Sequence, residues 1–281
     1  PAMSVYENIA SPMRIAKRPA AEIKDTVARI AELLRLTPYL DRLPLQLSGG
    51  QQQRTALARA LAKKAKLVLL DEPLANLDYK LREELRAELP KIFQGTGAVF
   101  VYATAEPEEA LLLGGNTATL EEGRVTQFGP TVDVYRRPNT LATARTFSDP
   151  PLNWGWVRKV GDKFVPESAD KTHDFDTIPV PQAHRDIADG RYAIAIRPHH
   201  LSLTPTGARD VKLSGKVFAT EITGSETYVH MHLIDHFIML THGVHHYDAG
   251  RQIDVHFDRD RLLVFDEGEN AVALPDTRAA A

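Results

Sequence analysis

The stretch that decides the fold reads Leu47-Ser48-Gly49-Gly50-Gln51-Gln52-Gln53-Arg54. The residues that follow are rich in alanine, leucine and arginine, and they predict a helix over 51–65. Two glycines let a ligand approach the backbone, Ser48 offers a hydroxyl, and the first N–H groups of a helix point outward without partners. A glycine turn with a serine cap would explain Ser48-Gly49-Gly50 alone, but the length of the run favours an anion-binding helix start.

A second run follows that helix and reads Leu67-Val68-Leu69-Leu70-Asp71-Glu72-Pro73. Consecutive apolar residues predict a strand buried on both faces of a parallel sheet. Such a strand delivers two carboxylates at its carboxyl end, where ligands bind in open α/β sheets. In phosphoryl-transfer ATPases an aspartate in this place holds Mg²⁺, and the adjacent glutamate can orient and deprotonate the attacking water. Alone, the pair is equally compatible with a solvated acidic turn.

The flanking segments predict an α/β arrangement. Residues 1 to about 47 are expected to be helical, because apolar residues recur at helical spacing between positions 23 and 34. Asp78 can cap a further helix, and residues 98–102 predict a second buried strand. A strand, a helix and a strand joined by short loops form a right-handed parallel crossover. The residues expected to line the buried face of the second helix are Leu81, Leu85, Leu89 and Ile92.

After Gly115 the pattern changes to short strands. Residues 117–120 and 124–128 predict a hairpin, residues 131–136 a short helix, and residues 148–151, with two prolines, a linker. Beyond the linker, several short alternating runs at regular spacing favour a small barrel or sandwich. The runs expected to be strands are 192–196, 211–220, 227–233, 237–241, 252–257 and 262–265.

The order and spacing of these segments, together with Leu74-Ala75-Asn76-Leu77-Asp78, resemble the ABC ATPase family. The resemblance implies a partial P-loop NTPase domain with a helical subdomain over residues 1–147, and ATP and Mg²⁺ as its ligands. It implies that Asp71 is the Walker B aspartate that holds Mg²⁺, that Glu72 is the catalytic glutamate, and that Asp78 is the D-loop aspartate at a dimer interface. The residues that match the signature loop, which in this family closes on ATP held by the opposite subunit, are Ser48, Gly49, Gly50 and Gln51.

Two features of the sequence depart from the family pattern. The 281 residues contain no Gly-x-x-x-x-Gly-Lys-Ser/Thr loop, so we expect an N-terminally truncated sequence, without Walker A and Q-loop, that is inactive and binds ATP poorly by itself. Ala105 stands where the family has its switch histidine, although Thr104 or Glu106 with water could substitute. An intact signature loop beside a degenerate switch position leads us to hypothesise a heterodimer, in which this subunit completes its partner's site and turns over slowly in its own.

The second half resembles the OB-like regulatory domain of maltose-type importer ATPases over residues 152–281. The resemblance rests on the segments 195–201, 215–217 and 224–227. It implies an ATPase subunit that energises import of a sugar, polyol, glycerol phosphate or related small polar solute. The implied partners are a second ABC ATPase subunit in a homodimer or heterodimer, integral-membrane permease subunits and, indirectly, a periplasmic or extracellular solute-binding protein. The implied location is the cytoplasmic face of the inner or plasma membrane, through the permease.

Composition limits the other classes of function. The net charge of −3 disfavours a dedicated nucleic-acid binder, and the lack of cysteine excludes a disulfide scaffold. The longest apolar runs are strand-sized, far short of the ~20 residues of a membrane helix. A non-transport ABC protein and a catalytically weak structural or regulatory subunit stay open as alternatives. Seven of the 11 histidines lie between His230 and His256, which makes a metal site conceivable, but solvated histidines are the favoured interpretation because no known ligand spacing is present.

Overall fold

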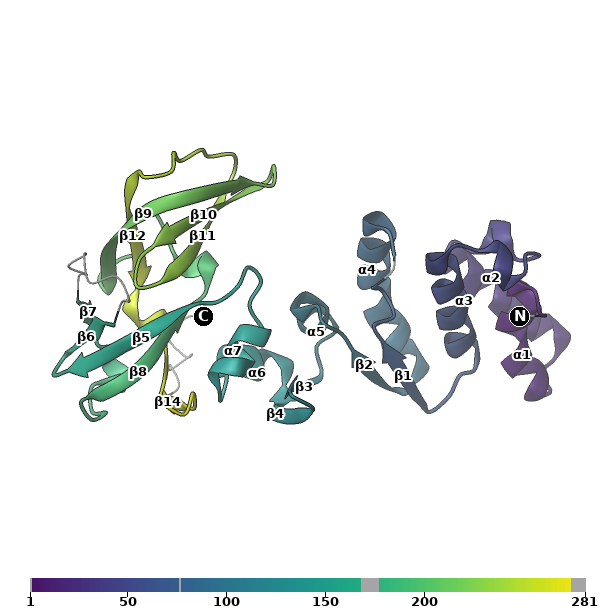
Figure 1. Ribbon diagram of the computed structural model, residues 1–281. Helices are drawn as coiled ribbons and strands as arrows, with labels where there is room; N and C mark the ends of the chain where they lie inside the picture. The colour runs from purple at the N-terminus through teal and green to yellow at the C-terminus, as the bar shows by residue number, and fades with distance from the viewer. Residues whose placement is uncertain (1, 76, 168–176, 274–281) are drawn as a thin grey trace. The chain divides into compact units, whose positions relative to one another are not determined.

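The computed structural model describes residues 2–75, 77–167 and 177–273. The chain forms two compact units that divide between Leu113 and Gly114. The first unit mixes helices with a parallel sheet, and the second consists mainly of antiparallel strands (Figure 1). The predicted order, an α/β half followed by an all-β half, is confirmed. Within the described residues, no helix combines the length and the apolar character needed to cross a membrane.

The first unit begins with helices that pack on one another. α1 (Val5–Ile15) starts in a capping box between Ser4 and Glu7, and α2 (Ala20–Leu33) is followed by the 3₁₀ turns η1 (Thr37–Tyr39) and η2 (Pro44–Gln46). Both helices contact α3 (Gly49–Ala62). The expected buried stripe of α2 is confirmed, since each of its members joins the first hydrophobic core. These members are Ile23, Val27, Ile30 and Leu34.

A two-stranded parallel sheet completes the first unit. β1 (Leu67–Asp71) pairs with β2 (Val99–Ala103), and the register places Asp71 opposite Ala103. α4 (Tyr79–Thr96) crosses between the strands, and α5 (Pro107–Leu113) follows β2. The Asp78 carboxylate caps α4 by accepting from the Leu81 amide at 3.0 Å, as predicted. α4 ends at Gly97, which adopts the left-handed conformation at φ 64°. Leu81, Leu85 and Leu89 are buried as expected, whereas the side chain of Ile92 lies outside the described residues.

The prediction that both strands are buried on two faces is wrong. Val68 and Leu70 enter the core, but Leu67 is 54% exposed and Leu69 is 69% exposed. β2 repeats this alternation, with Val99 and Val101 exposed. The core that covers one face is built from helical residues of the same unit, and no described element covers the other face. Continuous apolar sequence predicted two covered faces, but the described chain supplies a cover for only one.

The second unit starts with the predicted hairpin, β3 (Asn116–Glu121) and β4 (Arg124–Pro130). α6 (Thr131–Arg136) and α7 (Leu141–Thr146) follow. The side chains of Thr119, Thr126 and Thr143 form a ring of hydroxyl hydrogen bonds between 2.8 and 3.1 Å that fastens α7 to the hairpin. A side-chain hydroxyl can donate one bond and accept others, so the ring satisfies three polar groups in a region of low exposure.

The compact units do not coincide with the expected domains 1–147 and 152–281. Leu141 and Ala144 of α7 are buried in one cluster with Ala193 and Ala195 of β8 (Gly190–Ile196). The Leu141 amide also donates to the Glu269 carbonyl at 2.9 Å. Residues 114–147 therefore pack with the all-β part of the chain. The boundary between 147 and 152 stays a prediction about domains, distinct from the packing division at Leu113.

Two antiparallel sheets enclose the core of the second unit. One has the order β11-β10-β9-β12 and the other the order β14-β13-β8-β5-β6-β7. All six strands expected from the alternation are present, within a few residues of the predicted ends. The expected strands are β8, β9 (Asp210–Ile222), β10 (Glu226–His232), β11 (His236–His242), β12 (Gln252–Asp258) and β13 (Leu263–Phe265). The two sheets also contain β5 (Asn153–Val160), β6 (Lys163–Pro166), β7 (Ile178–Pro179) and β14 (Ala271–Ala273), which were not predicted.

The segment 195–201 is structural. Arg197 is buried, and its Nη2 donates to the Tyr135 carbonyl at 2.6 Å while its guanidinium lies over the Tyr135 ring. Burial lowers the pKa of His200 to about 3, and the neighbouring cationic groups reinforce the effect. His200 is therefore neutral at physiological pH. Trp154 and Trp156 are half-buried and pack against the Leu141 cluster.

Close packing predicts that Gly215→Ala destabilises the second unit. A Cβ at this position would lie 2.8 Å from Leu233 Cδ2 and 3.1 Å from the His232 carbonyl oxygen. Overpacking of this kind costs roughly 1–3 kcal/mol. Gly129→Ala is the matched control, because its Cβ would meet only Val134 Cγ2 at 3.7 Å. Urea unfolding should show a lower midpoint for Gly215→Ala alone; equal midpoints would contradict the packing at Gly215.

Candidate functional site

The residues that were predicted to form a signature loop lie at the start of α3. Ser48 is the N-cap, and its Oγ accepts from the Gln51 amide at 3.4 Å while the Ser48 amide donates to Gln51 Oε1 at 3.0 Å. The observed helix begins at Gly49, two residues earlier than predicted. A Cβ on Gly49 would meet nothing within 4 Å, and the residue has no positive φ. Neither packing nor backbone conformation within this chain requires glycine there, which fits close approach of a group from outside.

The two candidate carboxylates stand at the carboxyl end of β1. Asp71 is the last residue of the strand, and Glu72 follows with φ 43°, a left-handed conformation that is rare for residues other than glycine. The Glu72 amide donates to the Ala103 carbonyl at 2.9 Å, and its carbonyl accepts from the Ala75 amide at 3.2 Å. Strain of this kind is characteristic of functional sites, where surrounding bonds hold the residue in place.

Both carboxylates are available to a cation. Asp71 and Glu72 are exposed, and within the described residues no hydrogen bond or ion pair engages either carboxylate. Mg²⁺ prefers oxygen ligands and is commonly held by one or two carboxylates together with water and substrate phosphates. Among the described residues no cluster of three or more acidic or histidine side chains could hold a metal ion by itself. Asp71 offers the kind of oxygen ligand that Mg²⁺ prefers, and its role as a Mg²⁺ ligand stays a prediction.

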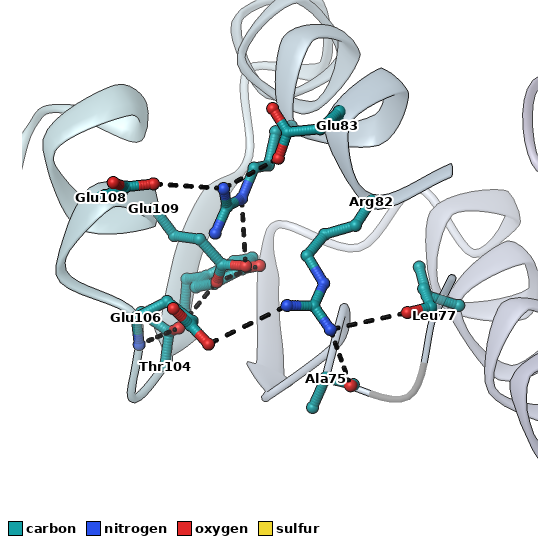
Figure 2. A network of polar contacts seen from close by, with 10 residues as sticks. Ala75, Leu77, Arg82, Glu83, Thr104, Glu106, Glu108 and Glu109 are labelled. Atoms are coloured by element: carbon teal, nitrogen blue, oxygen red, sulfur yellow. Dashed lines mark hydrogen bonds and ion pairs between the residues drawn. The ribbon is translucent and has the colours of Figure 1, made fainter. Parts of the chain in front are cut away.

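The loop between Glu72 and α4 is fastened by Arg82. Its Nη2 donates to the Ala75 carbonyl at 3.1 Å and to the Leu77 carbonyl at 3.5 Å. Arg82 Nη1 also lies 3.9 Å from the Glu106 carboxylate (Figure 2). The same arginine therefore links the segment before Asp78 to the loop that contains Ala105. Asn76 lies outside the described residues.

Ala105 is exposed at the turn after β2, and its neighbour Thr104 belongs to a buried polar network centred on Glu109. Glu109 Oε2 accepts from Thr104 Oγ1 at 2.7 Å and from the Tyr102 hydroxyl at 3.0 Å. The Glu106 amide donates to Thr104 Oγ1 at 3.0 Å, which fixes the backbone around Ala105. Burial and the Glu109 carboxylate raise the pKa of Tyr102, so the phenol keeps its proton and donates.

Arg86 of α4 balances the charge of this network. Its Nε lies 3.6 Å from Glu109 Oε1, and its Nη1 donates to Glu83 at 2.9 Å and to Glu108 at 3.3 Å. Burial lowers the pKa of Arg86, but the three glutamates outweigh it and raise the pKa overall. The loop around Ala105 is thus anchored to α4 and α5 by charge-assisted bonds, although position 105 itself offers no side-chain donor.

The structure brings Asp71, Glu72 and Ala105 together, because parallel pairing places the ends of β1 and β2 at one edge. Ser48 connects with them through α3, whose Gln53 Nε2 donates to the Glu72 carbonyl at 2.9 Å. That Ser48 and Asp71 serve one nucleotide across a subunit pair stays a prediction. The sequence analysis missed three residues that hold the site in place, and their roles depend on contacts between distant segments. These residues are Gln53, Arg82 and Glu109.

The histidines of the second unit give no sign of a metal site in the residues that the structure describes. His230 Nδ1 and His236 Nε2 lie 3.0 Å apart, and both rings contact Phe218. His230 Nε2 lies 3.3 Å from the Glu221 carboxylate. These two histidines therefore hydrogen-bond to each other, and His230 also lies within ion-pair distance of a carboxylate.

Comparisons with known proteins agree with this α/β site and its all-β companion. A family model described as "ABC transporter" matches residues 1–75, and one described as "TOBE domain" matches residues 194–265. The uncharacterized ABC transporter ATP-binding protein YcjV of Escherichia coli is 33% identical over 279 residues, covering 98% of this chain and 75% of YcjV.

Two further relatives bear the names of sugar importers. The trehalose/maltose import ATP-binding protein MalK of Thermococcus litoralis is 34% identical over 279 residues, covering 95% of this chain and 73% of MalK. The xylose/arabinose import ATP-binding protein XacK of Haloferax volcanii is 35% identical over 263 residues, covering 91% of this chain and 67% of XacK. Similarity of this extent shows that the chain belongs to the ABC transporter ATP-binding proteins and carries a C-terminal TOBE domain.

The Glu109 network predicts a large loss of stability for Glu109→Ala. The substitution leaves Arg86, whose side chain is 14% exposed, without its most buried partner. The Thr104 and Tyr102 hydroxyls also lose their acceptor, and a hydrogen bond to a charged group contributes about 1.5–3 kcal/mol. Arg86 itself keeps its contacts with Glu83 and Glu108. Glu88→Ala is the control, because Glu88 pairs with Lys91 on the surface, where such pairs contribute under about 1 kcal/mol. Denaturant unfolding measures both variants, and a similar small effect for each would contradict the importance of the network.

Proposed function

We propose that this protein is the ATP-binding, ATP-hydrolysing subunit that energises an ABC importer for a carbohydrate or a related small polar solute. The observation that carries the proposal is the similarity to MalK and XacK along more than nine-tenths of the chain, from the α/β site through the TOBE domain. Its proposed partners are a second ATPase subunit and integral-membrane permease subunits, with a solute-binding protein acting indirectly. The proposed location is the cytoplasmic face of the membrane.

The geometry supports distinct roles for the site residues. Asp71 would hold Mg²⁺, which supplies charge neutralisation of the nucleotide phosphates. Glu72 follows Asp71 directly and would orient and deprotonate the attacking water. The start of α3 would present the Ser48 hydroxyl and outward-facing amides to a nucleotide held by the partner subunit. Asp78, exposed at the N-cap of α4, would lie at the interface of the two subunits.

Substitution of Glu72 by glutamine tests the catalytic role. Loss of a general base typically costs 10²–10⁴-fold in rate, so Glu72→Gln should lower kcat for ATP hydrolysis by at least about a hundredfold, with nucleotide binding retained. Steady-state hydrolysis by the full-length protein assembled with its permease is the measurement. Glu122→Gln is the control, because Glu122 is also exposed and also has positive φ, at 48°, but lies in the turn of the β3–β4 hairpin. Equal rates for both variants would rule out the role of Glu72.

The absence of a donor at Ala105 favours a second candidate, a subunit whose own site turns over slowly within a heterodimer. In that arrangement the intact α3 start completes a competent site on the partner subunit. The Thr104 hydroxyl supports this view, because it is already engaged with Glu109 and with the Glu106 amide. Glu106 lies 3.9 Å from Arg82. Neither neighbour is therefore free to replace a histidine side chain without breaking an existing contact.

Introducing a histidine at position 105 separates the two candidates. If this subunit's site is slow because it lacks a transition-state donor, Ala105→His should raise hydrolysis by the full-length protein alone by about tenfold or more. Ala208→His is the control, because Ala208 is exposed in a loop of the second unit. Brisk hydrolysis by the unsubstituted homodimer, unchanged by Ala105→His, would exclude the slow-site hypothesis and leave the first proposal standing.

A further inference from the structure

We propose that Gln53 is a positioning residue that couples the signature helix to the catalytic glutamate, so that movement of α3 changes the alignment of Glu72. The inference rests on the proposed function, because it assigns Glu72 to ATP hydrolysis. It goes beyond that function by assigning a task to a side chain that contacts no nucleotide.

The contact itself has a defined orientation. Gln53 Nε2 donates to the Glu72 carbonyl oxygen at 2.9 Å across 19 residues of sequence. The opposite amide orientation would bring two oxygens together, so only the nitrogen can face Glu72. A side-chain donor in the N-terminal part of α3 is thus bonded directly to the backbone of the candidate general base, Glu72.

Three separate segments hold the Glu72 backbone. β2 contributes the Ala103 carbonyl at 2.9 Å, and the loop between β1 and α4 contributes the Ala75 amide at 3.2 Å. Gln53 contributes the third bond, from α3. Since Glu72 is in the left-handed region at φ 43°, it keeps this conformation only while surrounding contacts fix it. Removing the Gln53 bond releases the side of Glu72 that faces the signature helix.

The helix that carries Gln53 is held by consecutive polar side chains. Gln52 Nε2 donates to the Pro44 carbonyl at 3.1 Å and the Leu47 carbonyl at 3.2 Å, and Arg54 Nη1 donates to the Leu34 carbonyl at 3.2 Å. Gln52 therefore contacts the loop before Ser48, Arg54 contacts the end of α2, and Gln53 contacts Glu72. A displacement of α2 or of the Ser48 loop reaches α3 through these bonds and reaches Glu72 through Gln53.

The unpaired oxygen of the Gln53 side chain is energetically unfavourable, which indicates that its amide nitrogen has a specific role. Gln53 Oε1 is buried and has no hydrogen-bond partner within the described part of the chain. A buried polar atom without a partner destabilises a fold, and an apolar side chain of similar size would avoid that penalty. Within the described residues, the contact with Glu72 is the one hydrogen bond of the Gln53 side chain, so the amide nitrogen is paired while the amide oxygen is not.

The arrangement joins two nucleotide sites within one subunit. In the proposed dimer the start of α3 faces the partner's nucleotide, whereas Glu72 acts on the subunit's own nucleotide. Gln53 is therefore the side chain through which closure at one site aligns the base of the other. The expected consequence is that hydrolysis depends cooperatively on ATP and that this cooperativity requires the Gln53 donor.

The experiment compares Gln53→Leu and Gln53→Glu in the full-length protein assembled with its permease. Both variants keep the approximate size of the side chain and remove the donor. Misplacement of a catalytic group by about 1 Å can cost 10²-fold, so we expect kcat to fall about ten- to a hundredfold, KM for ATP to change less than about twofold, and the Hill coefficient to approach 1. Gln127→Leu is the control, because Gln127 Nε2 makes the same kind of bond, to the Arg137 carbonyl at 2.9 Å.

A double-mutant cycle makes the test specific. Adding Gln53→Leu to Glu72→Gln should produce no further loss, because the first substitution acts through the second residue. Wild-type kinetics for both Gln53 variants, or losses that multiply in the double variant, would overturn the positioning role while leaving the proposed function intact. A fall in thermal midpoint that accounts for the lost activity in both variants would also overturn it. An absence of hydrolysis by the unsubstituted protein would instead overturn the proposed function and this role together.

Discussion

The candidate site depends on the parallel pairing of β1 with β2. Its register sets Asp71 opposite Ala103, and the next amide, that of Glu72, donates to the Ala103 carbonyl. This one arrangement brings the carboxylates that follow β1 and the loop that follows β2 to the same edge. Arg82 and Glu109 then fix that loop from α4 and α5, and Gln53 reaches the edge from α3. If the strands were shifted by one residue, Asp71 would no longer stand opposite Ala103, and the Glu72 amide would lose this partner.

Local chemistry allowed much of this arrangement to be predicted. A glycine-rich start with Ser48, an apolar strand ending in Asp71 and a capping Asp78 each leave a signal within a few residues. Ser48 caps α3, Asp71 ends β1 and Asp78 caps α4, although β1 is covered on one face only. The strands of the second unit followed from alternation of apolar and polar residues. β5 escaped prediction because apolar and polar residues do not alternate along it. Trp154 and Trp156 occupy one face, while the more buried face contains the polar Asn153 and Lys159.

Long-range contacts explain what could not be predicted. Gln53 and Glu72 are joined by a hydrogen bond between a side-chain amide and a backbone carbonyl. Nothing in the sequence around either residue indicates that the two groups are partners. Glu109 resembles its neighbours Glu106 and Glu108 in sequence, yet it alone is buried at the centre of the polar network. The packing division at Leu113 could not be predicted from the sequence either. The sequence of α7 contains no motif indicating that this helix packs on the sheets of the second unit.

The uncovered side of the β1–β2 sheet has a practical meaning for work on this polypeptide. Four aliphatic side chains, Leu67, Leu69, Val99 and Val101, stand in two adjacent rows and each exposes more than half of its surface. Flat aliphatic strips of this kind attract one another in water. A preparation of this polypeptide should therefore be handled at low concentration or with a solubilising additive. Self-association through the strip would otherwise compete with correct folding.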